Sequence, residues 1–348
     1  MQADLPLAEL ERYRPPLDTI VAPGFDAFWA DTLAAAEAKA RPLSREPVDT
    51  GLVQILSEDL TFSGFGGQPV RAWLNRPAGF DGPLPAVVQF LGYGGGRGQP
   101  EEHLVWASAG YAHVVMDSRG QGSGWSGGRG STGATGDAVG NSTSDPTSDG
   151  GQGDRGGEGI ASGPQFPGML TRGIANPESY YYRRLFTDAT RLVREVKRLD
   201  GIDAGRVAVV GASQGGASAL AAAALEPVAA ALVDTPFLCH VAQAILMVDT
   251  EPYFEIVRYL RAHRDAADAV TRTLSHVDGV GFAARARAPA LFSIALMDRV
   301  IPPRTAFAAF NHYAGDKELV VYPYADHEGG EIDQLKRQIE FLRRRFSG

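Results

Sequence analysis

One short segment of the sequence has the pattern of a serine nucleophile on a sharp turn. The pentapeptide GASQG at 211–215 follows the apolar run RVAVV and precedes the helix-forming run ASALAAAAL. A strand before and a helix after such a turn form a nucleophile elbow, in which a strained serine projects its hydroxyl above a sheet. Glycines at both ends let strand and helix approach closely. The pattern therefore predicts that Ser213 is the nucleophile of an acyl transfer, rather than part of an ordinary Gly-Ser turn.

A serine hydroxyl needs a base, and this architecture supplies an acid and then a histidine later in the chain. His312 and His327 are the histidines that follow a suitable acid. His312 lies in the helix-like run RTAFAAFNHY, which is typical of a surface or packing residue. His327 follows the strand-like run LVVYP in the loop YADHEGG, from which it can reach the serine. We therefore expect His327 to be the base, with an exposed loop histidine as the alternative.

The acid has two candidates. Asp298 lies at the carboxyl end of the run LFSIAL, in the turn MDRVIPP, whereas Asp326 directly precedes His327. Neighbouring side chains in an extended loop tend to point apart, so Asp326 is less suited to orient the histidine ring. The sequence therefore favours Asp298.

The tetrahedral intermediate of acyl transfer also needs donors aimed at its oxyanion. One is expected to be the backbone N–H of Gln214, the residue after the nucleophile. The other is expected from the loop LGYGGGRG, which follows the apolar run at 86–91, and we favour the N–H of Tyr93. A phosphate-binding role for this loop is disfavoured because no Lys-Ser/Thr pair follows its glycines.

Apolar, β-branched runs alternate with helical stretches through most of the chain. This pattern predicts a mostly parallel sheet covered by helices on both faces, and together with the elbow at 211–215 it indicates an α/β-hydrolase fold. The runs are AVVQFL at 86–91, HVVMD at 113–117, RVAVV at 206–210, AAALVD at 229–234, LFSIAL at 291–296 and LVVYP at 319–323. A crossover helix is expected from Glu178 to Leu199, capped by Asn176 and with Pro177 in its first turn.

The chain divides by composition into an N-terminal extension and one catalytic domain. Residues 1–50 are expected to form a polar lead-in with one amphipathic helix, and 51–348 a single α/β-hydrolase domain that opens with two antiparallel strands. From Ser118 to Gly163 there are 16 glycines in 46 residues and few aliphatic side chains. We interpret 123–163 as a glycine-rich insertion that forms a mobile rim at the mouth of the site, with a solvated loop of no role as the alternative.

Composition excludes several classes of function. The hydrophobic fraction of 44% supports a large core, and the net charge of −8 argues against a nucleic-acid partner. The single cysteine, Cys239, rules out an internal disulfide and a cysteine-based metal site. No apolar run reaches the roughly 18 residues needed to cross a bilayer. Residues 1–22 lack the basic-then-apolar order of a signal peptide, so a cytoplasmic protein is expected.

Three short motifs give a specific family resemblance. Arg119-Gly120-Gln121, the segment GASQGG at 211–216, and His327-Glu328 occur in the order RGQ, GxSQGG and HE. With them the chain resembles the acetyl xylan esterase and cephalosporin C deacetylase family of carbohydrate esterases. Longer family-like stretches are MLTRGIANPESYYYRRLFTDA at 169–189, EPYFEIVRYL at 251–260 and MDRVIPPRTAFAAFNHY at 297–313.

The resemblance, which covers roughly residues 20–345 apart from the glycine-rich stretch, implies a triad of Ser213, Asp298 and His327. It also implies Tyr93 and Gln214 as oxyanion donors. A homohexamer is implied as well, with its sites facing an internal cavity that admits small acetylated substrates.

The chain also departs from the family. The family usually has a histidine before its Gly-Tyr, where this chain has Leu91, and the glycine-rich insertion is longer than expected. Arg119 and Gln121 are interpreted as structural residues, the arginine as a buried fork that braces loops. Glu328 is taken as the partner of Arg119.

The sequence thus predicts a serine esterase that removes acetyl groups from small molecules, such as acetylated xylo-oligosaccharides or cephalosporin C-like compounds. The mechanism would be a two-step acyl transfer, with no metal or organic cofactor. Alternatives are an oligopeptidase-like hydrolase on the same fold and a non-catalytic binding protein.

Overall fold

The centre of the fold is a nine-stranded sheet with the order β1-β2-β3-β5-β4-β6-β7-β8-β9. The computed structural model describes residues 4–80, 82–122, 124–125 and 166–346. Strands β1 to β3, and β3 with β5, pair antiparallel, whereas all pairs from β5 to β9 are parallel. The strands are β1 (Ser44–Val48), β2 (Ile55–Ser63), β3 (Pro69–Pro77), β4 (Leu84–Phe90), β5 (Ala112–Met116), β6 (Ile202–Ala212), β7 (Ala230–Asp234), β8 (Ala290–Ala295) and β9 (Lys317–Tyr322). The mostly parallel sheet expected from the apolar runs is present.

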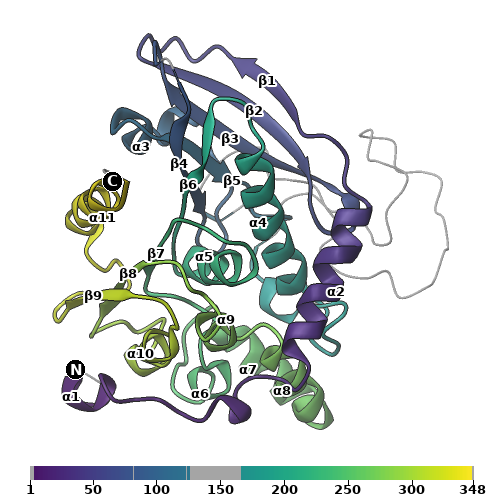
Figure 1. The fold of residues 1–348 in the computed structure, drawn as a ribbon. Coiled ribbons are helices and arrows are strands. Elements are labelled where there is room, and N and C mark those ends of the chain that lie inside the picture. Colours follow the sequence, from purple (N-terminus) through teal and green to yellow (C-terminus); the bar gives the residue numbers. More distant parts are fainter. Residues whose placement is uncertain (1–3, 81, 123, 126–165, 347–348) are drawn as a thin grey trace, which may run out of the picture.

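Helices cover both faces of this sheet (Figure 1). One face carries α2, α4, α5, α9 and α10, and the other carries α3 and α11. The helices are α1 (Leu7–Leu10), α2 (Phe25–Ala38), α3 (Val105–Ser108), α4 (Tyr181–Lys197), α5 (Gln214–Leu225), α6 (Val241–Ala244), α7 (Tyr253–Ala262), α8 (Ala267–Ser275), α9 (Gly279–Ala283), α10 (Pro303–His312) and α11 (Glu331–Phe346).

The central strands are apolar along their length because both of their faces are buried. In β4, Val88 packs into the core under α4 and α5, whereas its neighbour Val87 packs on the opposite side with Phe341 of α11. Successive side chains of a strand point to opposite faces, so a strand between two helical layers needs apolar residues at every position.

The crossover helix is shorter than the sequence pattern predicts. Helix α4 begins at Tyr181, not at Glu178, and Asn176 does not cap it. The Asn176 side chain instead accepts a hydrogen bond from the Glu178 amide at 2.9 Å, which closes a turn before the helix. An asparagine followed by proline serves a turn as well as a helix start, so the pattern predicts the helix but not its first residue.

Strand β1 lies within the region predicted to be a lead-in with one helix. Its sequence SREPV is polar and contains Pro47, and it pairs with β2 at the edge of the sheet. An edge strand tolerates proline and polar residues because one of its sides needs no partner. The pairing is reinforced by Arg45, which donates to Glu58 at 2.7 Å. The division of the chain at residue 50 stays a prediction.

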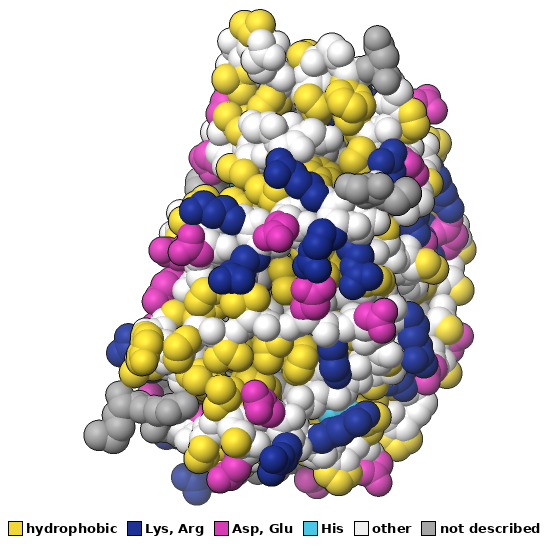
Figure 2. All heavy atoms as spheres, turned by 60° about the vertical axis from the view of Figure 1, so that its left-hand side comes forward, with side chains coloured by type: hydrophobic (Ala, Val, Ile, Leu, Met, Phe, Trp, Pro, Cys, Tyr) yellow, Lys and Arg dark blue, Asp and Glu magenta, His cyan; other side chains and the backbone are white. Residues whose placement is uncertain are grey.

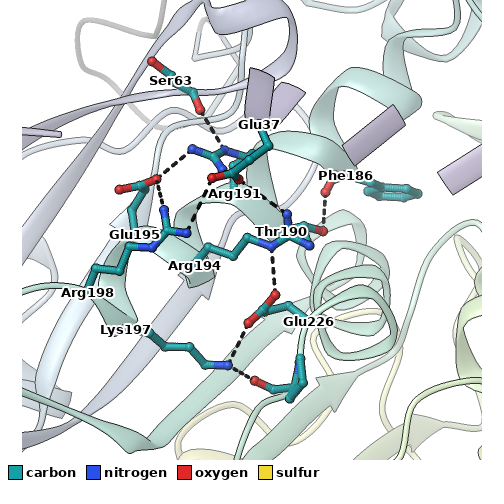
Figure 3. A network of polar contacts seen from close by, with 11 residues as sticks. Glu37, Ser63, Phe186, Thr190, Arg191, Arg194, Glu195, Lys197, Arg198 and Glu226 are labelled. Atoms are coloured by element: carbon teal, nitrogen blue, oxygen red, sulfur yellow. Dashed lines mark hydrogen bonds and ion pairs between the residues drawn. The ribbon is translucent and has the colours of Figure 1, made fainter. Parts of the chain in front are cut away.

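A polar network ties the helices of one face together. The Arg191 side chain of α4 is fully buried and donates to the Ser63 carbonyl at 3.3 Å and to Glu195 at 2.7 Å. It also pairs with Glu37 of α2. Figure 3 shows the network continuing along α4 to Glu226, just beyond the end of α5. Charged pairs that are buried and multiply hydrogen-bonded hold a defined geometry, so α2, α4 and α5 are fixed relative to one another.

The opposite face carries charges of both signs. Figure 2 shows Lys and Arg side chains interspersed with Asp and Glu over the side of the molecule that bears α3 and α11. Arg344 of α11, for example, pairs with Glu318 of β9 at 2.9 Å. A surface of mixed sign does not produce the continuous positive potential that binds a phosphate backbone.

Candidate active site

The strand–turn–helix context of the serine is present as the sequence predicts. Ser213 lies between β6 and α5 with φ 56° and ψ −121°, a conformation that L residues rarely adopt. Its amide donates to the Asp234 carbonyl at 3.0 Å, and its own carbonyl accepts from Phe237 at 3.0 Å. These bonds hold the strained turn against the end of β7.

The glycines on either side of the serine are required by close backbone contacts. A Cβ on Gly211 would lie 2.2 Å from the Gly215 carbonyl, and a Cβ on Gly215 would lie 2.2 Å from the Phe90 carbonyl. Strand β6, helix α5 and the end of β4 therefore meet at a spacing that only glycine allows. This packing places the first turn of α5 beside the loop that follows β4.

The predicted base and acid are joined directly. His327 Nδ1 lies 2.8 Å from Asp298 Oδ2, and the Asp298 side chain is only 2% exposed. Asp298 Oδ1 accepts two further bonds, from the amides of Val300 and Ile301, both at 2.8 Å. Because a carboxylate only accepts, the ring is protonated at Nδ1 and its Nε2 is free to take a proton.

Asp326, the weaker candidate, serves the loop rather than the imidazole ring. Its carboxylate accepts from the Arg299 amide and the His327 amide, both at 2.9 Å, and from the Arg299 side chain at 2.6 Å. It therefore shapes the backbone around the histidine, as expected for an adjacent residue.

The His327 loop reaches the same edge of the sheet as the serine. A Cβ on Gly329 would lie 3.9 Å from the Thr235 side chain, and Thr235 directly follows the carbonyl that binds Ser213. Among the residues that the structure describes, no hydrogen bond joins the Ser213 hydroxyl to His327. His312, in contrast, is buried and bonds to the Pro15 carbonyl at 2.8 Å, as expected for a packing residue.

The two predicted oxyanion donors have free amides. Neither the Tyr93 N–H nor the Gln214 N–H has an acceptor within the described part of the chain. The Gln214 side chain is buried and donates to the Leu91 carbonyl at 3.2 Å, which ties the elbow to the loop after β4. Two unpaired N–H groups on adjoining segments are what an oxyanion hole requires.

Two of the three motif residues, Arg119 and Gln121, are buried and form side-chain hydrogen bonds. Arg119 is fully buried and forms a two-pronged pair with Asp188 of α4 at 2.7 Å, which fits its predicted bracing role. Gln121 accepts from the Gly94 amide at 2.6 Å and donates to Gln214 at 2.9 Å.

The predicted partner for Arg119 is wrong. Glu328 is exposed, and its carboxylate accepts from the Asp326 amide at 3.1 Å. Asp188 could have been identified from the family-like stretch at 169–189, where the only other acid is Glu178 at the start of the expected helix.

Residues 124 and 125 of the predicted glycine-rich insertion adjoin the oxyanion loop, whereas 123 and 126–163 lie outside the described residues. Trp125 donates from its indole to the Tyr93 carbonyl at 2.7 Å. Phe166 packs edge-on against the Tyr93 ring, with ring centroids 5.2 Å apart. The described residues on both sides of the gap therefore contact Tyr93, whereas the predicted rim itself stays a prediction.

Sequence reasoning missed Asp234, an acid at the carboxyl end of β7 next to the elbow. Its Oδ1 accepts from the Ser293 hydroxyl at 2.6 Å and from Gln334 at 2.9 Å, and its Oδ2 accepts from Gln338 at 2.6 Å. The last two belong to α11, so this carboxylate links the C-terminal helix to the strand that holds Ser213. Its position at a strand end beside the nucleophile is the signal that could have identified it.

Asp234 is expected to make stability depend on pH. Burial raises the pKa of Asp234 from 3.8 to about 6, although its three hydrogen bonds oppose the rise. Between these values the folded state holds more protons than the unfolded state, so the free energy of unfolding falls as pH rises. Relative to Asp234→Asn, the wild type should lose about 1–3 kcal/mol between roughly pH 4 and pH 7. Urea unfolding of both proteins across this range checks the expectation, and parallel profiles would contradict it.

Among the described residues, no group of His, Cys, Asp and Glu side chains is arranged to hold a metal ion. No helix in that part of the chain is long and apolar enough to cross a membrane.

Known proteins share both the sequence and the fold. The acetyl xylan esterase (AXE1) family model matches residues 1–345. Acetyl esterase Axe7A of Xylanibacter ruminicola is 28% identical over 162 residues, which are 46% of this chain and 36% of that protein. The chain thus spans about a third of the length of this curated relative.

Two solved structures match along nearly the whole chain. The acetyl xylan esterase from Paenibacillus sp. R4 has a TM-score of 0.82 at 34% identity, over 98% of this chain and 99% of that one. Acetyl xylan esterase 1 from Thermoanaerobacterium sp. JW/SL YS485 has a TM-score of 0.80 at 28% identity, over 99% of both chains. These matches confirm the α/β-hydrolase fold and the resemblance read from the three motifs. The chain belongs to the acetyl xylan esterase (AXE1) family of serine hydrolases.

Proposed function

We propose that this protein hydrolyses acetyl esters of small molecules through Ser213, His327 and Asp298. The observation that carries the proposal is a strained serine whose amide is bonded to the end of β7, where the loop of a histidine–aspartate pair of 2.8 Å also lies. A buried aspartate that accepts from Nδ1 directs Nε2 of the neutral ring to act as the proton acceptor, as a general base requires.

In the acylation step, Ser213 Oγ attacks the ester carbonyl while His327 Nε2 takes the hydroxyl proton. The carbonyl oxygen gains the electron pair and is stabilised by the N–H groups of Tyr93 and Gln214. Collapse of the intermediate breaks the bond to the alcohol oxygen, which receives the proton from His327. The products are the free alcohol and an acetylated Ser213.

In the deacylation step, water replaces the alcohol. His327 removes a proton from the water as its oxygen attacks the acetyl carbonyl, and the same two N–H groups hold the oxyanion. The bond to Ser213 Oγ breaks and His327 returns the proton to the serine, which releases acetate. Asp298 stabilises the imidazolium in both steps.

The substrate class follows from the relatives. Two solved relatives are acetyl xylan esterases and a curated relative is an acetyl esterase, which supports acetylated xylo-oligosaccharides as substrates. Cephalosporin C-like acetyl esters are proposed from the resemblance of the three sequence motifs. The homohexamer with an internal cavity and the cytoplasmic location stay predictions of the sequence.

Acyl-chain length should affect turnover strongly. For p-nitrophenyl esters, kcat/KM is expected to fall roughly 10²-fold or more from acetate to octanoate, because the acetyl esterases among the relatives support a site that takes a short acyl chain. Because the leaving group is constant, the series isolates the acyl pocket. Comparable values across the series would instead indicate a general carboxylesterase. An aminoacyl p-nitroanilide in the same assay should not be cleaved, and efficient cleavage would indicate a peptidase.

A further inference from the structure

The phenol of Tyr93 lies at the centre of a compact set of hydrogen bonds. It donates to Glu255 Oε1 at 2.7 Å and accepts from the amides of Met169 at 2.8 Å and Gly168 at 3.2 Å. Two amides can only donate, so the single phenolic proton must go to Glu255. Burial and the neighbouring Glu255 carboxylate raise the pKa of Tyr93 well above its ordinary value, and the phenol therefore keeps that proton.

Glu255 collects three donors on one carboxylate. It lies on α7, is only 4% exposed, and accepts from the Tyr93 phenol and the Gly168 amide at Oε1. Its Oε2 accepts from the Leu170 amide at 3.1 Å. The carboxylate thus joins three segments that are far apart in the sequence: the loop after β4, the turn at 168–170 and helix α7. None of these bonds contributes to the triad.

Tyr93 is the one residue through which this set can act on the oxyanion loop. The loop sequence at 92–96 is GYGGG, so Tyr93 carries its only side chain. Gly94 adopts φ +81°, a conformation that glycine enters freely and that does not by itself fix the loop. Two bonds from other segments also hold the loop, from the Gly94 amide to Gln121 at 2.6 Å and from the Trp125 indole to the Tyr93 carbonyl at 2.7 Å. The Tyr93 phenol is the side-chain anchor that the loop itself supplies, and it acts on the residue whose N–H is assigned to the oxyanion.

We propose that Glu255 is a positioning residue for the oxyanion hole, which holds the Tyr93 phenol and thereby fixes the direction of the Tyr93 N–H. The inference rests on the proposed function, because it assigns that N–H to the oxyanion. It adds a carboxylate, distant from the triad in the sequence, whose removal should weaken transition-state stabilisation without removing a reacting group.

The test uses Tyr93→Phe, Glu255→Gln and the double variant. Tyr93→Phe leaves the backbone N–H of residue 93 chemically unchanged, so any loss of rate must come from its position. We expect kcat for p-nitrophenyl acetate to fall about 10- to 100-fold, with KM within about threefold of wild type. Glu255→Gln should lower kcat by a smaller factor, because the amide oxygen of glutamine can replace one of the two carboxylate oxygens that accept hydrogen bonds. The double variant should resemble Tyr93→Phe, because both substitutions act on the same hydrogen bond between the Tyr93 phenol and Glu255.

A thiono substrate separates positioning from a loss of structure. Sulfur accepts N–H hydrogen bonds poorly, so replacing the carbonyl oxygen of the acetate ester by sulfur should slow the wild type strongly. In a variant whose N–H no longer points at the oxyanion, replacing oxygen by sulfur removes a weaker hydrogen bond. The ratio of kcat for the oxygen ester to kcat for the thiono ester, called the oxygen-to-sulfur ratio, should therefore fall toward one. A variant that is only partly folded would lose rate on both substrates equally and keep the wild-type ratio.

Tyr313→Phe provides the matched control. Tyr313 is also buried and donates its phenolic proton to the Ala288 carbonyl at 2.6 Å, near the end of α10. It should match Tyr93→Phe in its effect on the thermal midpoint but leave kcat and the oxygen-to-sulfur ratio unchanged.

The inference is overturned if Tyr93→Phe and Glu255→Gln keep the wild-type kcat, or lose it with an unchanged oxygen-to-sulfur ratio. Its failure differs from failure of the proposed function. The latter would show as turnover that survives removal of the Ser213 hydroxyl, which Glu255 does not contact.

Discussion

Ser213→Ala is expected to lower kcat for acetyl esters roughly 10⁴- to 10⁶-fold while leaving the fold intact. The hydroxyl is the proposed nucleophile, and neither histidine nor water can form the acyl-enzyme in its place. The backbone bonds that hold the elbow, from the Ser213 amide to Asp234 and from Phe237 to the Ser213 carbonyl, do not involve the hydroxyl. The measurement is initial rates with p-nitrophenyl acetate beside thermal unfolding.

Ser275→Ala is the matched control for this change. Ser275 ends α8, and its hydroxyl donates to the Arg272 carbonyl at 2.8 Å, away from the elbow. It should retain wild-type activity. A Ser213→Ala protein that is folded and keeps more than a few per cent of the wild-type rate would remove Ser213 from the mechanism.

Asp298→Asn should cost roughly 10³- to 10⁴-fold in kcat, although it changes one atom. The amides of Val300 and Ile301 both donate to Oδ1, so the asparagine oxygen must occupy that position. Its NH₂ group then faces His327 Nδ1, where the aspartate accepts at 2.8 Å. An NH₂ donor can pair only with an unprotonated Nδ1, so the ring proton moves to Nε2. The ring can then no longer take the serine proton.

Asp326→Asn tests the choice between the two acids. The amide oxygen of an asparagine can still accept from the backbone of Arg299 and His327, and only the exposed pair with the Arg299 side chain is weakened. Exposed ion pairs contribute about 0–1 kcal/mol, so the variant should stay within about tenfold of wild type. If Asp326→Asn were the more damaging change, the assignment of Asp298 as the acid would be wrong.

Much of the fold and the local geometry at the site follow from short-range patterns. The elbow at 211–215 was predictable because strand, turn and helix are adjacent in the chain. The parallel strands were predictable because residues such as Val87 and Val88 are apolar on both faces. The side-chain pairing of His327 with Asp298 follows from chain order and from the strand ends that carry both residues.

The rest depends on contacts that no local pattern records. Strand β1 is polar and exists because β2 offers it an edge. Arg119 pairs with Asp188, and Tyr93 with Glu255, across separations of 69 and 162 residues. Both acids lie within stretches that resemble the family, but nothing in their immediate sequence shows which side chain each one binds.

In the proposed mechanism the acetyl group passes through Ser213. The most direct test is to mix the enzyme with excess p-nitrophenyl acetate, quench in acid within the first turnovers, digest, and locate the added acetyl group by mass spectrometry. We expect one acetyl group on Ser213 of the wild type and no acetyl group on any residue of Ser213→Ala. Turnover with no acetyl-enzyme in either protein, or an acetyl group that accumulates on another residue at the catalytic rate, would contradict it.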